Sequence, residues 1–240
     1  MQKKKNWPTK LAITCLVLFC FWAALRFTNT LQYYSVPSSG NSPTINKGDI
    51  IWASRFKTLQ RGNFITFKTY DSLVGHIAIW TKRCVGMPGD TLLMKDGILF
   101  VNGENVDKNY TLKNEYIIYS HQLAKFIDSL QLIQTDEENF QQSESYLQLL
   151  LTASQLKAAQ LLLTPGQDSI KQFIYPNEGV YQPPFFVKMG KTKWTMDNFG
   201  PLRVPIDHYF VLGDNRHMSQ DSRFIGFIKK EDYVATVLGK

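Results

Sequence analysis

Lys82 is the residue whose neighbours most favour chemistry in this sequence. It lies in a strand-like segment where side chains alternate between two faces, so it shares a face with the uncharged Trp80 and Cys84, while Arg83 points the other way. A lysine that loses water has a lowered pKa, and its neutral amine can accept a proton from a hydroxyl group. The alternative is a solvated lysine on an edge strand. The segment is therefore a candidate for a general base.

Residues 35–49 form a second segment with chemical potential, rich in serine and glycine and containing two prolines. This composition is typical of a linker. It equally suits a rigid turn that presents a hydroxyl nucleophile, and the sequence by itself leaves both readings open.

A third segment, residues 213–223, is a dense polar run that follows an apolar stretch. Its polar and charged members are Asp214, Asn215, Arg216, Ser219, Asp221, Ser222 and Arg223. Such a run can form a turn held by its own charge-assisted hydrogen bonds. It can also position a catalytic amine, with Ser219 as hydrogen-bond partner and Asp221 with Arg223 as a supporting ion pair.

Together these segments resemble those of the type I signal peptidases, membrane-bound endopeptidases with a Ser–Lys dyad. The run from Lys82 to Asp90 is similar to the general-base segment of that family, and residues 213–227 are similar to its C-terminal signature. Arg61-Gly62-Asn63 before an apolar strand resembles a further family strand, with Asn where Asp is usual. The resemblance covers about residues 7–103 and 196–232.

The resemblance implies a mainly antiparallel β fold with a hydrophobic surface beside the membrane. Lys82 would be the general base and Ser219 would orient its amine, while the bracing residues would be Asp214, Arg216, Asp221 and Arg223. The substrate would be the extended end of a signal peptide, with small residues at the first and third positions before the cut. No metal or organic cofactor is implied, because side chains and water suffice for this chemistry.

The first family motif departs from the pattern in this chain. Alignment on Pro37 and Pro43 places the oxyanion serine at Ser38 and the nucleophile at Gly40, which has no hydroxyl group. In one reading, Ser39 acts as nucleophile after a shift of one residue, and Ser38 or backbone amides stabilise the oxyanion. In the other, the chain is a non-catalytic relative that binds signal peptides.

Ser42 is a further candidate nucleophile, although the proline after it stiffens its backbone. We favour an active enzyme with Ser39 and Lys82 as its catalytic pair. The alternative is an envelope binding or scaffold protein on the same fold.

The N-terminal residues predict a membrane anchor. Residues 11–29 are mostly apolar and residues 1–10 are rich in lysine, which favours a transmembrane helix whose N-terminus is cytoplasmic. A cleaved signal peptide is the rival reading, but no convincing cleavage site follows. In a bacterium the main domain would then lie outside the inner membrane. The net charge of +7 comes partly from this tail, and nothing in the sequence favours a nucleic-acid partner.

Hydrophobic patterns divide the remaining chain into a β core and an insertion. Strands are predicted at 49–53, 64–68, 76–85, 91–94, 98–101 and 209–212, with a hairpin turn at Lys95-Asp96-Gly97. Helices are predicted near 123–133 and 146–163, and a strand at 184–187. The expected domains are a β core of residues 30–103 and 196–240 and a mixed α/β insertion of residues 104–195.

Overall fold

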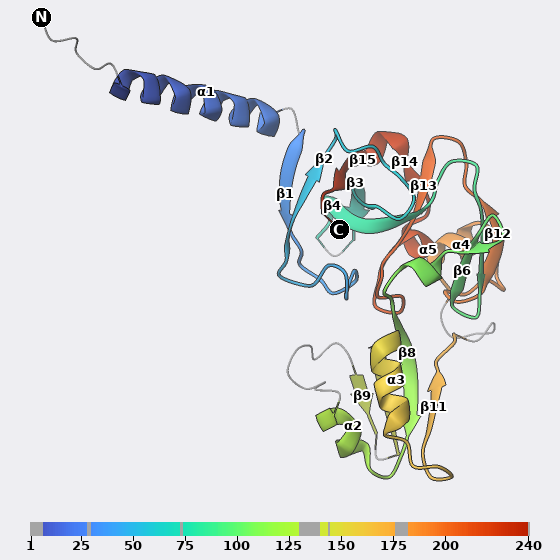
Figure 1. Ribbon diagram of the computed structural model, residues 1–240. Helices are drawn as coiled ribbons and strands as arrows, with labels where there is room; N and C mark the ends of the chain where they lie inside the picture. Colours follow the sequence, from blue (N-terminus) through green and yellow to red (C-terminus); the bar gives the residue numbers. More distant parts are fainter. Residues whose placement is uncertain are drawn as a thin grey trace, which may run out of the picture.

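The computed structural model of the protein describes residues 7–27, 30–72, 74–129, 140–143, 145–175 and 182–239. It is a mainly antiparallel β structure with an N-terminal helix, and both parts of this prediction are confirmed. Figure 1 shows three parts: the helix α1, an upper β body and a lower lobe reached through strand β8.

The largest sheet holds the strands that surround the candidate catalytic residues. Its order is β1 (Leu31–Ser35), β2 (Ile50–Ser54), β15 (Tyr233–Val237), β3 (Phe64–Asp71), β4 (His76–Gly86), β13 (His208–Leu212) and β14 (Ile228–Lys229). Each neighbouring pair is antiparallel. The strands predicted from alternating and apolar runs in this part of the chain are confirmed.

A second, four-stranded sheet completes the upper body. Its order is β12 (Phe199–Arg203), β5 (Thr91–Lys95), β6 (Ile98–Val101) and β7 (Glu104–Asn105). The predicted hairpin turn is present, and Asp96 and Gly97 both have positive φ, as a tight two-residue β turn requires. Buried Leu92, Leu99 and Phe210 join this sheet to the larger one in a shared hydrophobic core.

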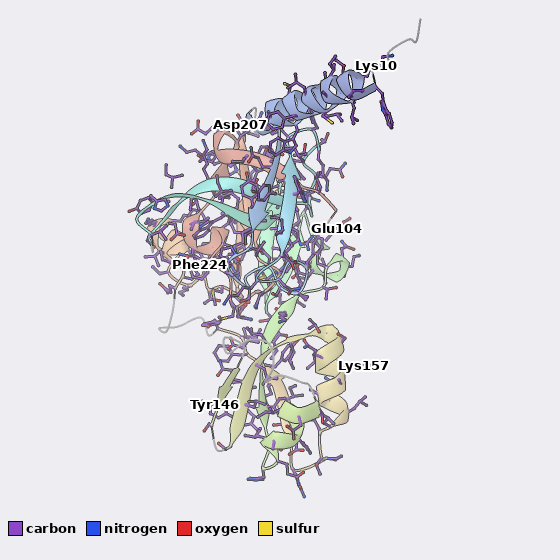
Figure 2. The ribbon with its side chains drawn as sticks, turned by 90° about the vertical axis from the view of Figure 1, so that its left-hand side faces the viewer. Lys10, Glu104, Tyr146, Lys157, Asp207 and Phe224 are labelled. Carbon is purple, nitrogen blue, oxygen red and sulfur yellow. The ribbon has the colours of Figure 1, made fainter. Side chains whose placement is uncertain are left out.

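The lower lobe has a sheet and a hydrophobic core of its own (Figures 1 and 2). Its strand order is β11 (Ser169–Gln172), β8 (Lys113–Tyr119), β10 (Tyr146–Thr152) and β9 (Phe140–Gln142), accompanied by α2 (Leu123–Ser129) and α3 (Ala153–Leu161). This lobe falls inside the predicted insertion, whose bounds of 104 and 195 stay a prediction. The predicted helix near 123 is present as α2, and its expected continuation beyond Ser129 lies outside the described residues.

The predicted helix at 146–163 is wrong in its first half, which is strand β10. Leu147, Leu149 and Leu151 alternate toward the core of the lobe, and this period of two selects a strand. The helix begins only after Thr152, whose side chain forms a capping box with Gln155.

The predicted strand at 184–187 is also wrong, because this segment is the short helix α4 (Pro184–Lys188). Proline at the first helical position has a fixed φ that suits a helix start. Phe186 of this helix is buried in the core of the upper body, against Trp194 and Phe199. Local backbone preference and tertiary packing therefore outweigh the high β propensity of the two phenylalanines.

The N-terminal helix α1 spans Trp7–Phe27, so it starts inside the predicted tail and ends two residues before the predicted anchor does. Residues 1–6, 28 and 29 lie outside the described residues. Figure 1 shows α1 extending away from the upper body beside β1. Counted over the described residues, none of the helices combines the length and apolar character needed to cross a membrane.

Candidate active site

A pocket of about 440 Å³ is lined by the end of β1, the segment that follows it and the middle of β4. One wall is formed by residues 34–38, Gly40 and Asn41, the other by Ile79, Trp80, Thr81 and Lys82, and Asp71, Met218 and Gln220 complete the lining. Two of the three polar segments singled out in the sequence thus face each other, and Met218 and Gln220 come from the third.

Lys82 is buried at this pocket, with 6% of its surface exposed. Burial lowers the pKa of its amine from 10.5 to about 8, although the negative charges of Asp221 and Asp214 raise it and the positive charge of Arg223 lowers it further. Within the described part of the chain we find no hydrogen bond or ion pair to this amine. A lysine with such a pKa is partly neutral at mildly alkaline pH and can act as a base.

The pairing of β4 explains why the buried Lys82 borders the pocket. On one side β4 pairs with β3 along its length, and Lys82 lies opposite Ile65. On the other side the described pairing with β13 begins only at Arg83, which lies opposite Leu212. Lys82 is therefore the last residue of the edge of β4 that β13 leaves unpaired, and this edge runs back along the pocket.

Gly40 occupies the position next to the lysine. A Cβ atom added to Gly40 would lie 2.8 Å from Nζ of Lys82 and 3.6 Å from Cα of Ser219. Two backbone hydrogen bonds fix the turn in this place. The backbone N–H of Asn215 donates to the Gly40 carbonyl at 3.2 Å, and the backbone N–H of Ser42 donates to the Ser39 carbonyl at 2.9 Å. The position that sequence alignment assigned to the nucleophile is thus beside the amine, without a side chain.

The three candidate serines have different surroundings. Ser38 is exposed and lines the pocket. Ser39 is buried, with 3% of its surface exposed, and is not among the residues described as lining the pocket. The Ser42 hydroxyl donates to Oδ1 of Asn46 at 2.9 Å, which directs it toward its own turn. Of the three, only Ser38 is among the residues that line the same pocket as Lys82.

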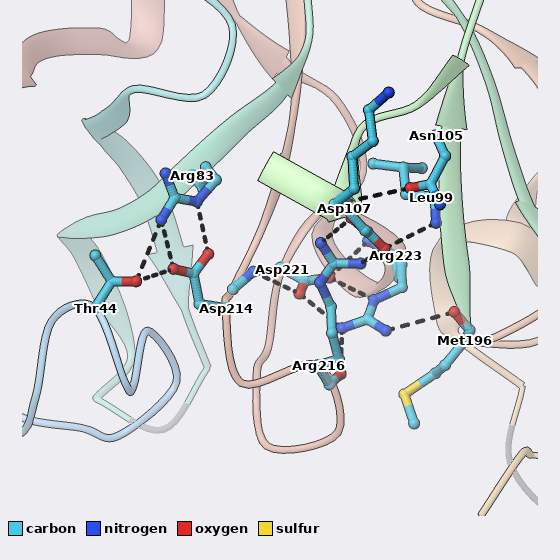
Figure 3. A network of polar contacts seen from close by, with 12 residues as sticks. Thr44, Arg83, Leu99, Asn105, Asp107, Met196, Asp214, Arg216, Asp221 and Arg223 are labelled. Atoms are coloured by element: carbon cyan, nitrogen blue, oxygen red, sulfur yellow. Dashed lines mark hydrogen bonds and ion pairs between the residues drawn. The ribbon is translucent and has the colours of Figure 1, made fainter. Parts of the chain in front are cut away.

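Asp214 and Arg83 form a buried ion pair behind the pocket (Figure 3). Nε of Arg83 donates to Asp214 at 2.7 Å, and the guanidinium lies between the rings of Phe64 and Tyr110, 4.2 and 4.3 Å from their centroids. The Thr44 hydroxyl also donates to Asp214. These contacts attach the serine-containing turn to β4 and to the polar segment after β13, and the bracing role of Asp214 in catalysis stays a prediction.

Asp221 and Arg223 form a second, fully buried ion pair at 2.8 Å, the pair expected from their spacing. Although burial raises it, the pKa of Asp221 is lowered overall by the charge and hydrogen bonds of Arg223 and by the Gly213 amide. Arg223 also donates to the Arg216 carbonyl at 2.6 Å. The two charges therefore fix the loop between β13 and α5 (Ser222–Ile225) from within (Figure 3).

Arg216 is not among the pocket-lining residues and pairs with Asp107 at 2.7 Å. Asp107 begins the short 3-10 helix η1 (Asp107–Asn109) and was not singled out in the sequence. Nothing in its spacing signals the contact, because the two residues are far apart along the chain. Thr44, which binds Asp214, was likewise missed, although it lies within the first motif.

The Ser219 hydroxyl is buried but does not form the hydrogen bond to Lys82 that the resemblance implies. It has no hydrogen-bond partner among the described residues. The hydroxyl instead lies against Gly213, where an added Cβ would be only 2.1 Å from it, so glycine is required there. The orienting role of Ser219 stays a prediction.

Asn41 replaces the methionine that is usual in the family. Its Nδ2 donates to the Thr81 carbonyl at 2.7 Å, which holds the turn against β4 one residue before Lys82. Its Oδ1 is buried without a partner among the described residues. The hydrogen bond of Asn41 therefore joins the two walls of the pocket.

The chain is thus a mainly antiparallel β protein whose buried Lys82 lines a pocket. The profile of the family described as "Signal peptidase, peptidase S26" matches residues 8–239. The chain belongs to this family, and the resemblance inferred from its motifs is confirmed. Membership places the chain among peptidases. The family description and the names of the relatives indicate that the activity of this family is the processing of signal peptides.

Individual relatives are distant. The chain is 27% identical to signal peptidase I of Buchnera aphidicola subsp. Schizaphis graminum over 86% of its own length and 65% of that protein. It is 23% identical to signal peptidase I P of Bacillus subtilis subsp. natto, over 97% of its length and 88% of that protein. A crystal structure of a signal peptidase I from Enterococcus faecalis aligns with a TM-score of 0.32 at 24% identity, covering 75% of this chain and 97% of that one.

Proposed function

We propose that this chain is a membrane-attached endopeptidase that removes signal peptides from exported preproteins, with Lys82 as its general base. One observation carries the proposal: the amine of Lys82 is buried at a peptide-sized pocket with a pKa of about 8. A base with this pKa is partly neutral near working pH and still basic enough to accept a proton from a hydroxyl group.

The free edge of β4 supports binding of an extended peptide. Apart from the Thr81 carbonyl, which already accepts a hydrogen bond from Asn41, the β4 backbone before Arg83 can pair with an added strand, which gives affinity without regard to sequence. The apolar Ile79 and Trp80 and the segment after β1 form walls that suit small and apolar side chains. Because the edge ends at Lys82, the bond to be cut would lie beside the amine.

The reaction requires a hydroxyl nucleophile. A serine hydroxyl attacks the carbonyl carbon while Lys82 takes its proton, and the departing amine then receives that proton. Water, deprotonated by Lys82, hydrolyses the resulting ester. Ser39 is our candidate nucleophile from the sequence, and it needs the turn to rotate because its side chain is buried. Ser38 lines the pocket and is the alternative.

The helix α1 supports the membrane attachment. Its apolar side chains are exposed on several faces, including Leu16, Val17, Leu18 and Phe19, so the upper body does not cover them. A helix that is apolar all round is normally surrounded by lipid or protein. We propose that α1 is a single-pass anchor in the cell membrane with its lysine-rich end in the cytoplasm and the β body outside.

A second candidate function, signal peptide binding without cleavage, is favoured by Gly40. This residue leaves the position beside the Lys82 amine without a hydroxyl group. A chain that keeps the pocket and the lysine while lacking this group could retain peptides without hydrolysing them.

Cleavage of several purified preproteins in detergent separates the two functions. We expect wild-type protein to release signal peptides, and Ser39→Ala and Lys82→Ala to lose this activity. Loss in Ser38→Ala or Ser42→Ala, with Ser39→Ala still active, would overturn our choice of nucleophile. Folded wild-type protein that binds preproteins but cuts none of them would establish the binding function instead.

A further inference from the structure

We propose that Asn41 determines which peptides this site accepts, because its side-chain amide takes the hydrogen bond that a bound peptide would otherwise make to the Thr81 carbonyl. The inference rests on the proposed recognition of signal peptides and holds for both candidate functions. It names a ligand class: extended peptides with no N–H group at the position facing Thr81, such as peptides with a proline there.

The Thr81 carbonyl belongs to the edge of β4 that a peptide would join. The backbone N–H of Cys84 donates to the Asn63 carbonyl at 2.8 Å, and the Cys84 carbonyl accepts from the Gly62 N–H at 2.7 Å. The backbone groups of Cys84 therefore face the side of β3. Backbone groups of successive residues alternate between the two sides of a strand, so those of Arg83 and Thr81 face the opposite side, where Arg83 pairs with β13.

An added peptide and Asn41 compete for this carbonyl. By the same alternation, Thr81 and Ile79 are the pocket-lining residues of β4 whose backbone groups face an added strand, and Thr81 is the one next to Lys82. An added strand would place one of its own N–H groups against the Thr81 carbonyl. Nδ2 of Asn41 already donates to it at 2.7 Å. Asn41 comes from the opposite wall of the pocket, so its amide lies in the space that the peptide would enter.

Asn41 is held in this position by its own backbone. Its carbonyl accepts from the Ile45 N–H at 3.0 Å, and the neighbouring Gly40 carbonyl accepts from the Asn215 N–H at 3.2 Å. The residue is buried, with 4% of its surface exposed, although it lines the pocket. A peptide therefore meets the Asn41 amide as a fixed part of the wall.

The amide of Asn41 contributes little to the fold, which favours a role toward a ligand. Its Nδ2 donates to Thr81, whereas its Oδ1 is buried without a hydrogen-bond partner among the described residues. An unpaired buried acceptor offsets much of the stabilisation from the hydrogen bond. Leucine, which has nearly the same size, would remove the bond and the unpaired acceptor together. We therefore expect Asn41→Leu to unfold in urea at nearly the same midpoint as wild type.

The effect on a peptide depends on whether it has an N–H group at this place. An ordinary residue has an N–H whose acceptor is already taken, and a buried donor without a partner weakens binding. A residue without an N–H, such as proline, has no donor to leave unpaired. When the Asn41 amide is removed the order reverses, because the Thr81 carbonyl then needs the peptide N–H.

The test compares peptides that differ in one backbone N–H group. The parent is a six-residue peptide with alanine at its last and third-from-last positions and a C-terminal amide. In each further peptide one internal amide is replaced by an ester, which removes the N–H group with little change of shape. Binding to the full chain in detergent at pH 7 is measured by fluorescence anisotropy for wild type, Asn41→Leu and Asn41→Ala.

We expect the parent peptide to bind both Asn41 variants about fivefold more tightly than wild type, since the freed carbonyl gains a partner. One ester peptide should bind the variants about fivefold more weakly than the parent does, while the same ester should change wild-type binding by less than about twofold. This difference measures the coupling between Asn41 and a single peptide N–H. Because leucine and alanine differ in size, an effect that both share results from the lost donor.

A control and two contrary outcomes complete the test. Gln160→Leu removes an exposed amide from α3 in the lower lobe and should leave every affinity as in wild type. The inference is overturned, while peptide recognition stands, if no ester position distinguishes the Asn41 variants from wild type, or if these variants weaken all peptides equally. Failure of every peptide to bind, together with failure to bind or cleave any preprotein, overturns the proposed function and this inference with it.

Discussion

A lysine amine held out of water both weakens the fold and gains reactivity. The folded-state pKa of Lys82 is about 8 against 10.5 for a solvated lysine. Below pH 8 the amine is protonated in both the folded and the unfolded state, so the full free-energy cost of burying the charge is present. Between pH 8 and 10.5 only the unfolded chain binds this proton, so stability should rise with pH over this window.

Replacing Lys82 with methionine should therefore stabilise the protein at pH 7. A pKa difference of this size corresponds to at most about 3 kcal/mol, and we expect a gain of about 1–3 kcal/mol in the free energy of unfolding. The measurement is urea unfolding followed by tryptophan fluorescence. The exposed Lys68→Met is the control and should change little. A destabilised Lys82→Met at pH 7 would contradict the assigned cost of the buried charge.

Gly40→Ser tests what the missing side chain means. It places a hydroxyl group beside the amine, and Gly40 has no positive φ that would exclude a side chain. We expect preprotein cleavage to rise by at least tenfold over wild type, with new covalent labelling by acylating serine-protease inhibitors. Gly40→Ala is the matched control for crowding of Lys82. Equal rates for the serine and alanine variants would argue that position 40 is unrelated to the chemistry.

Much of the site could be predicted residue by residue from the sequence, because the motifs are local. Lys82 is buried on a strand face as its alternation indicates, and the Asp221–Arg223 pair joins residues two apart. The partners Thr44 and Asp107 were missed, since a contact across 100 or more residues leaves no mark on local spacing. The orientation of the Ser39 side chain also depends on how its turn docks against β4.

At the scale of elements, the loop after β13 is stabilised by a fully buried ion pair. Asp221 and Arg223 are both 0% exposed, and removing one partner leaves an unpaired charge in the interior. We expect Asp221→Asn to lower the free energy of unfolding by about 3–5 kcal/mol and to reduce activity by displacing the loop.

A surface pair provides the comparison for this change. Lys229 and Glu231 are more than half exposed, so Glu231→Gln should cost less than about 1 kcal/mol. Thermal unfolding of both variants measures the difference. Equal losses would mean that the buried pair has no special role in holding the loop.

Element prediction was reliable where one period dominated and failed where tertiary contacts decided. β3, β4, β5 and β6 follow clear apolar patterns bounded by glycine turns. In the lower lobe, the leucine-rich run 146–163 is compatible with both a strand and a helix. The sheet pairing of β10 with β8 makes its first half a strand. The helix α4 depends on Pro184 and on the burial of Phe186, and the second factor is not visible in a local window.

At the scale of the whole molecule, α1 is the part that leaves the protein body (Figure 1). If it is a membrane anchor, charges in its apolar middle should release the protein from lipid. We expect the double variant Leu16→Lys, Leu18→Lys to lose most flotation with liposomes, because each central lysine costs about 2.5–3.5 kcal/mol. Leu161→Lys alters an exposed leucine at the end of α3 and should float like wild type. Unchanged flotation of the double variant would contradict the anchor.

The central claim is that Lys82 is the general base of a signal peptide endopeptidase. The most direct test is the rate of preprotein cleavage by the full chain in detergent, compared between wild type and Lys82→Met from pH 6 to pH 10. We expect the wild-type rate to rise with pH through a midpoint near 8, the pKa of Lys82, and the methionine variant to be inactive throughout. A flat wild-type profile, or cleavage that persists in Lys82→Met, would contradict it.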